Sequence, residues 1–139
     1  MFALAYFLLL ACYPHATADR VEELVAIAED IATAGAPAGD APAATGTALG
    51  APATEEEVRL LVGIAVHESR APLHAVGDGG LSKGPWQVRG PRHDATAALE
   101  RVRWSYRICG DLSAFAGCGR CGSCPEIVKS LGDPTLPRR

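Results

Sequence analysis

The sequence predicts a mainly helical (α+β) domain with a small β-hairpin, preceded by an export signal. Three longer segments place apolar residues at helical spacing, and boundary residues mark where they start or stop. A glycine-rich stretch at 77–80 follows the second segment and requires tight turning of the backbone. The chain has 139 residues, of which 48% are hydrophobic, so it can bury the core of one domain.

Residues 1–18 are expected to form the export signal. The run from Phe2 to Cys12 is almost wholly apolar and too short for an ordinary membrane span. Ala16-Thr17-Ala18 offers a small-x-small cleavage site, although no Lys or Arg precedes the apolar run. Three other interpretations stay open: a lipoprotein attached through Cys12, an uncleaved anchor and a buried N-terminal helix. We therefore expect an exported protein, periplasmic or secreted, with no stable membrane span after processing.

The segment 19–33 is predicted to be an amphipathic helix, for which Asp19 is a suitable cap. Residues 34–53 are built almost entirely from Ala, Gly, Pro and Thr, and they are expected to form a flexible linker. Such a linker would leave the first helix peripheral to the folded unit. That unit is predicted to span 54–132, before a frayed tail at 133–139.

The second helix is predicted to run from Thr54 to about Ser69. Thr54 and Glu57 have the spacing of a capping box, in which each residue satisfies the backbone N–H of the other. Beyond this helix, a short strand at 86–88 is expected to pair with 75–76 across the glycine-rich turn. Three further helices are predicted, and they cover 95–109, 111–116 and 125–131.

Cysteine usage supports export. The chain has five Cys, of which one lies in the presumed signal. The remaining four are Cys109, Cys118, Cys121 and Cys124. An even set in an exported chain indicates two disulfides, whose connectivity the sequence leaves open. A four-thiolate zinc site and a redox pair are the alternatives for these residues.

Glu68 is the most informative candidate residue. Val58, Leu61 and Ala65 form the apolar stripe of the second helix, and Glu68 follows at the same spacing in the last turn. Apolar surroundings and the negative end of the helix dipole both disfavour an ionised carboxylate. A carboxyl group that holds its proton near neutral pH can act as a general acid. The alternative is a solvated glutamate at a fraying helix end.

Residues 61–88, taken together, resemble the catalytic segment of lytic transglycosylases and goose-type lysozymes. The stretch 61–70 is similar to a family helix that ends in Glu-Ser, here Glu68-Ser69. The stretch 75–88 is similar to the glycine-rich hairpin that follows in that family and finishes in Gly-x-x-Gln, here ending at Gln87. The Glu-to-Gln spacing is also similar.

A third family element is matched loosely. Residues 114–117 resemble a helix end that reads roughly Ala-x-x-Tyr-x-x-Gly, and Cys109-Gly110 precedes it as a Cys-Gly segment does in many members. Phe115 stands where the family usually has a Tyr whose hydroxyl lies near the catalytic acid. Tyr106 is an alternative source of that hydroxyl, or the role is lost.

The resemblance implies a lysozyme-like domain that cleaves peptidoglycan glycan strands between N-acetylmuramic acid and N-acetylglucosamine by transglycosylation. Glu68 would act first as acid and then as base, so a second carboxylate is not needed. Asp78 could position a water, or it could simply form an Asp-Gly turn. Trp86 has two equally supported interpretations: it stacks on a sugar face, or it belongs to the hydrophobic core. The expected substrate-binding or orienting residues are Ser69, Ser82, Trp86, Gln87, Tyr106 and Phe115.

No metal or organic cofactor is expected, and the protein is expected to be a monomer. A formal net charge of −3 and 6% aromatic residues give no sign of a nucleic-acid partner, although a local basic patch is compatible with them. Three alternatives remain for the function: a lysozyme-type hydrolase, a non-catalytic wall-binding or disulfide scaffold protein, and a zinc-binding adaptor that uses the four Cys.

Overall fold

The computed structural model describes residues 1–36, 50–69 and 74–132. Most of the predicted linker and the whole of the predicted tail lie outside these ranges. The described part contains five α-helices and a three-stranded antiparallel sheet, which confirms the mainly helical α+β class. In chain order the elements are α1 (Phe2–Cys12), α2 (Ala18–Thr33), α3 (Glu55–Ser69), β1 (Val76–Gly77), the 3₁₀ turn η2 (Asp78–Gly80), β2 (Ser82–Lys83), β3 (Val88–Arg89), α4 (Ala95–Cys109) and α5 (Pro125–Gly132).

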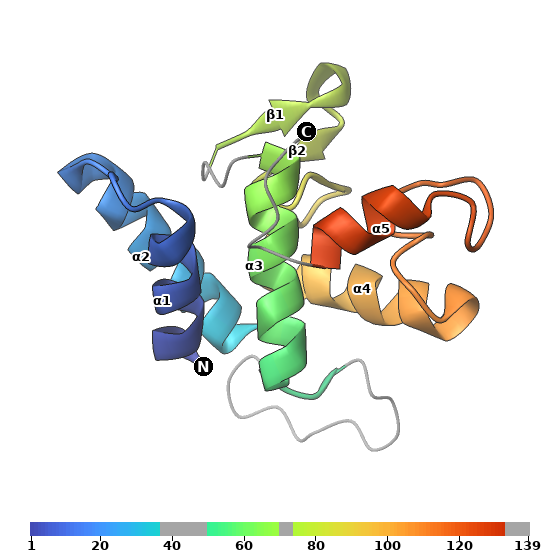
Figure 1. Ribbon diagram of the computed structural model, residues 1–139, viewed down its shortest axis with the longest axis horizontal. Helices are drawn as coiled ribbons and strands as arrows, with labels where there is room; N and C mark the ends of the chain where they lie inside the picture. The colour runs from blue at the N-terminus through green and yellow to red at the C-terminus, as the bar shows by residue number, and fades with distance from the viewer. Residues whose placement is uncertain (37–49, 70–73, 133–139) are drawn as a thin grey trace.

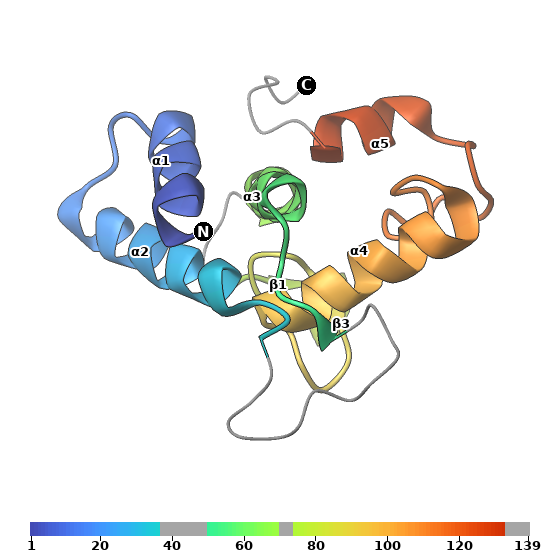
Figure 2. The same cartoon turned by 90° about the horizontal axis from the view of Figure 1, so that it is seen from below.

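Helix α3 lies at the centre of the molecule. Helices α1 and α2 lie on one side of it and α4 and α5 on the other, and the same order is seen when α3 is viewed along its axis (Figures 1 and 2). The predicted stripe of Val58, Leu61 and Ala65 is fully buried. Val62 and Ile64 are buried as well, because neighbouring helices cover α3 from more than one direction.

The N-terminal helices are part of the core. Helix α1 packs against α2 and α3 and buries Ala5 and Leu9 completely. Helix α2 also contacts α4, where the carboxylate of Asp30 accepts a hydrogen bond of 3.0 Å from the backbone N–H of Ala95. Helix α2 therefore does not stand apart from the folded unit. None of the described helices combines the length and apolar character needed to cross a bilayer.

The caps of the second and third helices follow simple side-chain chemistry. The predicted capping box of α3 is confirmed, since the Thr54 N–H donates to the Glu57 carboxylate at 2.8 Å and the Glu57 N–H donates to the Thr54 hydroxyl at 3.2 Å. The predicted cap of α2 is wrong by two residues. Thr17, not Asp19, accepts the hydrogen bond from the backbone N–H of Arg20.

The sheet differs from the predicted hairpin. Strand β1 pairs with β2, and β2 pairs with β3, so the predicted direct pairing of 75–76 with 86–88 is wrong. Gly79 and Gly80 have positive φ angles, which turn the chain back soon enough for Ser82–Lys83 to form the central strand. The result is a small three-stranded cap near the C-terminal end of α3 (Figure 1).

The C-terminal part is only partly helical. Helices α4 and α5 confirm the predictions for 95–109 and 125–131. The predicted helix at 111–116 is wrong, because this segment forms turns in which Asp111 Oδ1 accepts a hydrogen bond of 2.7 Å from the Ser113 N–H. The two predicted disulfides are confirmed, and they join Cys109 to Cys121 and Cys118 to Cys124.

Candidate active site

A cavity of about 420 Å³ lies where the end of α3, the small sheet, α4 and the turns after α4 meet. Four of the predicted site residues line it, namely Glu68, Ser82, Gln87 and Phe115. They come from distant parts of the sequence. The remaining lining residues are Arg89, Arg101, Ala116 and Gly117.

Glu68 lines this cavity from the last turn of α3, but it is an exposed residue. The buried, dry position expected from the apolar stripe is therefore a wrong prediction. The buried part of the stripe ends at Ala65, which is fully buried and lies three residues before Glu68. The carboxyl group accordingly meets solvent as well as the cavity wall.

Gln87 is held in an unusual backbone conformation with φ of 49°, which is uncommon for a residue other than glycine. Its backbone N–H and its side-chain amide both donate to the carbonyl oxygen of Gly84, at 3.2 and 3.0 Å. These two bonds fix the side chain. Outliers of this kind concentrate at binding and active sites.

Gly77 makes room for that side chain. A Cβ atom placed on Gly77 would lie 2.1 Å from the side-chain oxygen of Gln87, far inside contact distance. Strand β1 therefore passes directly against the amide, and a larger residue at position 77 would displace the Gln87 side chain from this position. The glycine-rich stretch thus has a second role in addition to turning the chain.

Ser82 and Phe115 form buried parts of the cavity wall. Ser82 lies in β2, opposite Gly77 and Arg89 in the two neighbouring strands, and is 4% exposed. Phe115 is 9% exposed, and its backbone N–H donates to the hydroxyl of Ser105 at 3.0 Å. The phenyl ring gives the cavity an apolar wall without a hydroxyl group.

Two predicted site residues lie elsewhere. Trp86 is 1% exposed, and its indole N–H donates to the backbone carbonyl of Leu61 at 2.9 Å. The structure therefore supports a role for Trp86 in the hydrophobic core and not in sugar stacking. Tyr106 lies in a different hollow of about 660 Å³, beside Glu56 and Arg103. Burial, followed by the charges of Glu56 and Asp111, raises the pKa of Tyr106 and keeps the phenol neutral at ordinary pH. The family's Tyr hydroxyl is therefore not replaced from this position.

The side chains of Ser69 and Asp78 lie outside the described part of the structure. The roles predicted for them stay predictions.

Arg89 and Arg101 are site residues that the sequence analysis missed. Arg89 is exposed in β3, and Arg101 is half-buried in the middle of α4. The two residues belong to no common sequence motif. They line one cavity because α4 lies beside the sheet in the folded protein. The chain is acidic overall, yet two arginines line the same cavity as its candidate acid.

The four C-terminal cysteines are joined in disulfides, so their sulfurs are not available as zinc ligands. Among the residues that the structure describes, no three His, Cys, Asp or Glu side chains gather in a way that could hold a metal ion.

No family model, curated protein or solved structure matches the chain. The likeness to lytic transglycosylases and goose-type lysozymes therefore depends on the sequence segments named above.

Proposed function

We propose that the protein is a peptidoglycan lytic transglycosylase with a lysozyme-like fold, in which Glu68 is the catalytic acid and base. The observation that carries this proposal is that Glu68 and Gln87, the acid and the amide of the family-like segment 61–88, line one cavity. A carboxyl group and a fixed amide group on the wall of a polar cavity suit the recognition of a sugar and the cleavage of its glycosidic bond.

The reaction needs one carboxyl group. Protonated Glu68 donates its proton to the oxygen that joins N-acetylmuramic acid to the next sugar, and this glycosidic bond breaks. The resulting carboxylate then accepts the proton of the muramic 6-hydroxyl while that oxygen bonds to the anomeric carbon. The product is a 1,6-anhydro sugar, no water is consumed, and Glu68 ends the cycle protonated.

The bound strand itself would complete the site. A sugar ring that fills the cavity would displace water from Glu68. The exposed carboxyl group would then lie in less polar surroundings than in the protein alone. The Gln87 amide would orient the sugar by hydrogen bonding, Ser82 would line the same wall, and the Phe115 ring would contact an apolar sugar face. This division of labour gives Glu68 its general-acid role in the complex with substrate.

Mass spectrometry of the fragments released from purified cell walls tests the proposal. The protein is expected to release anhydro-muropeptides, and Glu68→Gln is expected to lower the rate at least about a hundredfold, the usual contribution of a general acid or base. Glu56→Gln is the matched control, since Glu56 is an exposed glutamate of the same helix that does not line this cavity. Equal release by wild type and Glu68→Gln would refute the catalytic role.

Two alternatives give different results in the same experiment. A lysozyme-type hydrolase would release fragments heavier by one water, because water replaces the muramic hydroxyl as nucleophile. A non-catalytic wall-binding protein would release nothing, while wild type and Glu68→Gln would sediment with walls to the same extent. The exposure of Glu68 and the missing hydroxyl at Phe115 are the observations that favour this last alternative.

We also propose export from the cytoplasm. Two disulfides favour an oxidising compartment, and small exported domains commonly depend on such bonds. N-terminal sequencing of the protein purified from its source distinguishes the possible fates of residues 1–18. A start at Asp19 indicates cleavage, and a lipidated start at Cys12 indicates the lipoprotein. An intact N-terminus would mean that α1 keeps its place beside α2 and α3.

A further inference from the structure

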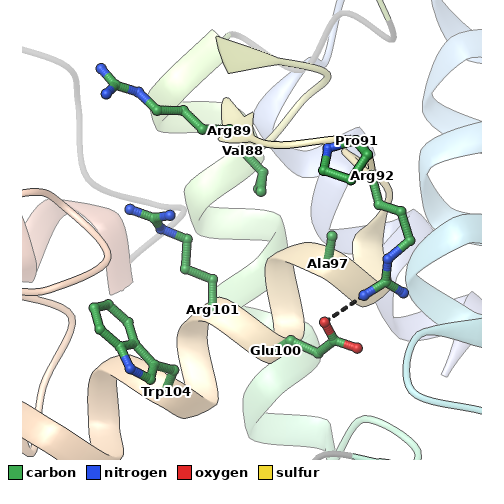
Figure 3. A pocket seen from close by; sticks show the side chains of 8 residues that line it. All are labelled: Val88, Arg89, Pro91, Arg92, Ala97, Glu100, Arg101 and Trp104. Carbon is green, nitrogen blue, oxygen red and sulfur yellow. Dashed lines mark hydrogen bonds and ion pairs between the residues drawn. The ribbon is translucent and has the colours of Figure 1, made fainter. Parts of the chain in front are cut away.

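A second hollow adjoins the candidate active site. It has a volume of about 490 Å³, and it shares Arg89 and Arg101 with the Glu68 cavity. The two hollows therefore meet at these arginines. Figure 3 shows both side chains projecting to the same side, one from the sheet and one from α4.

Residues of one helical face form the floor of this second hollow. Ala97, Arg101 and Trp104 follow one another at steps of four and three along α4, which places them on the same side of the helix. Trp104 is 43% exposed, in contrast to the buried Trp86. A hollow lined by an exposed indole and by two arginines suits a ligand with both apolar and anionic parts.

The charges of the second hollow favour an anion. Arg92 is paired with Glu100 at 2.6 Å, so these two charges offset each other at one end (Figure 3). Arg101 forms no ion pair with any other residue that the structure describes. An arginine fork binds a carboxylate through two parallel hydrogen bonds, so Arg101 provides a suitable site for one, and Arg89 adds a second positive charge to the same hollow.

We infer that this second hollow binds a carboxylate of the stem peptide that hangs from the muramic sugar. The inference depends on the proposed function, because that function places a glycan strand in the neighbouring cavity. A strand cleaved at Glu68 carries its stem peptide on the sugar beside the broken bond. The peptide then extends past Arg89 and Arg101 toward Trp104, and the enzyme prefers strands that carry stems over strands without them.

Binding to a protein that cannot turn over its ligand provides the test. Glu68→Gln is titrated by calorimetry with a stem-bearing muropeptide tetrasaccharide, with the same tetrasaccharide after removal of its stems, and with chitotetraose. The stripped sugar keeps its lactyl carboxylates and chitotetraose has none, so the series separates the two sources of negative charge. The stem-bearing ligand is expected to bind most tightly, and its advantage is expected to shrink at high salt.

Variants then locate the site. In the Glu68→Gln background, Arg101→Gln is expected to weaken binding of the stem-bearing ligand by about tenfold, and Arg89→Gln by a smaller factor. Both arginines also line the sugar cavity, so chitotetraose affinity is expected to fall as well, but by clearly less than the affinity for the stem-bearing ligand. Arg101→Lys keeps the positive charge but lacks the two-pronged guanidinium. Its affinity for the stem-bearing ligand is expected to lie between those of the parent protein and Arg101→Gln. Arg107→Gln is the matched control, since it removes an exposed arginine of the same helix outside both hollows.

The outcomes separate this inference from the proposed function. Equal binding of stem-bearing and stripped ligands, or an equal effect of Arg101→Gln on all three ligands, would overturn the stem site while wall cleavage by the wild-type protein remained. Failure of the wild-type protein to cleave walls would refute the catalytic proposal instead. A preference for stems that depends on Arg101 supports the inference.

Discussion

The two sides of α3 are held together by different forces. On the side of α1 and α2, fully buried aliphatic side chains meet with few polar interruptions. On the far side, between the packed helices α4 and α5, residues 110–124 form successive turns without a helix or strand. This segment is closed by two disulfides and by hydrogen bonds to two buried serine hydroxyls, those of Ser105 and Ser113.

The difference shows how a short chain builds a cavity. Apolar packing covers α3 on one side and fixes its direction, because such contacts are numerous and non-directional. The cavity wall at Phe115 belongs to the other side, where directional bonds hold turns that a helix could not replace. Rigidity near Glu68 therefore depends on cross-links, whereas global stability depends on the packed helices.

Trp86→Ala is expected to have the largest effect on stability. The indole is buried against α3 and donates a hydrogen bond to the Leu61 carbonyl, so its removal should cost about 3–5 kcal/mol of the free energy of unfolding. Trp104→Ala is the matched control and is expected to change it by less than about 1 kcal/mol, because Trp104 is 43% exposed. Urea unfolding measures both. Similar losses from the two variants would show that Trp86 is not part of the main core.

Removal of the Cys109–Cys121 disulfide is expected to have an intermediate effect. Replacing both residues by Ser in a Cys12→Ser background should cost about 2–4 kcal/mol, since the cross-link restricts the unfolded chain. The local consequence is sharper. Backbone amides in 110–124 should lose protection from hydrogen exchange while those of α3 keep it. Cys12→Ser alone is the control, and a uniform loss of protection in both regions would contradict the division proposed here.

Local signals in the sequence predicted most of the helices. The capping box of Thr54 and Glu57 located the start of α3, and helical spacing located α4, which ends where Gly110 takes a left-handed conformation. The sheet was predicted poorly because its strands have two residues each, too few for an alternating pattern. At 111–116 the side-chain bond of Asp111 competes with helix formation, which apolar spacing does not reveal.

The candidate site was predictable only where residues are close in sequence or match a family pattern. Glu68 and Gln87 were predicted, and they line one cavity. The exposure of Glu68 depends on which elements cover the last turn of α3, and this is a property of tertiary packing. The same holds for Arg101. It lines the cavity only because α4 lies beside the sheet, and no local sequence pattern predicts that arrangement.

Loss of the ion pair between α3 and α4 is expected to have the smallest effect on the free energy of unfolding. Arg103 of α4 binds both carboxylate oxygens of Glu57 at the start of α3, at 2.7 and 2.8 Å, and this hydrogen-bonded pairing lowers the pKa of Glu57. A carboxyl whose pKa is lower in the folded state stabilises the fold above its unfolded value of about 4.3, and that contribution is lost as the pH falls through the folded value.

Glu57→Gln removes the charge but keeps an acceptor for the capping box. It is expected to lower the free energy of unfolding by about 1 kcal/mol at pH 7, and by less at pH 3, because the stabilisation from the lowered pKa declines once the pH falls below the unfolded value. Urea unfolding at the two pH values measures the difference, with exposed Glu56→Gln as control. An effect of Glu57→Gln that is the same at both pH values would mean that the junction between α3 and α4 depends on hydrogen-bond geometry and not on charge. The link between the packed side and the cross-linked side would then be insensitive to acid.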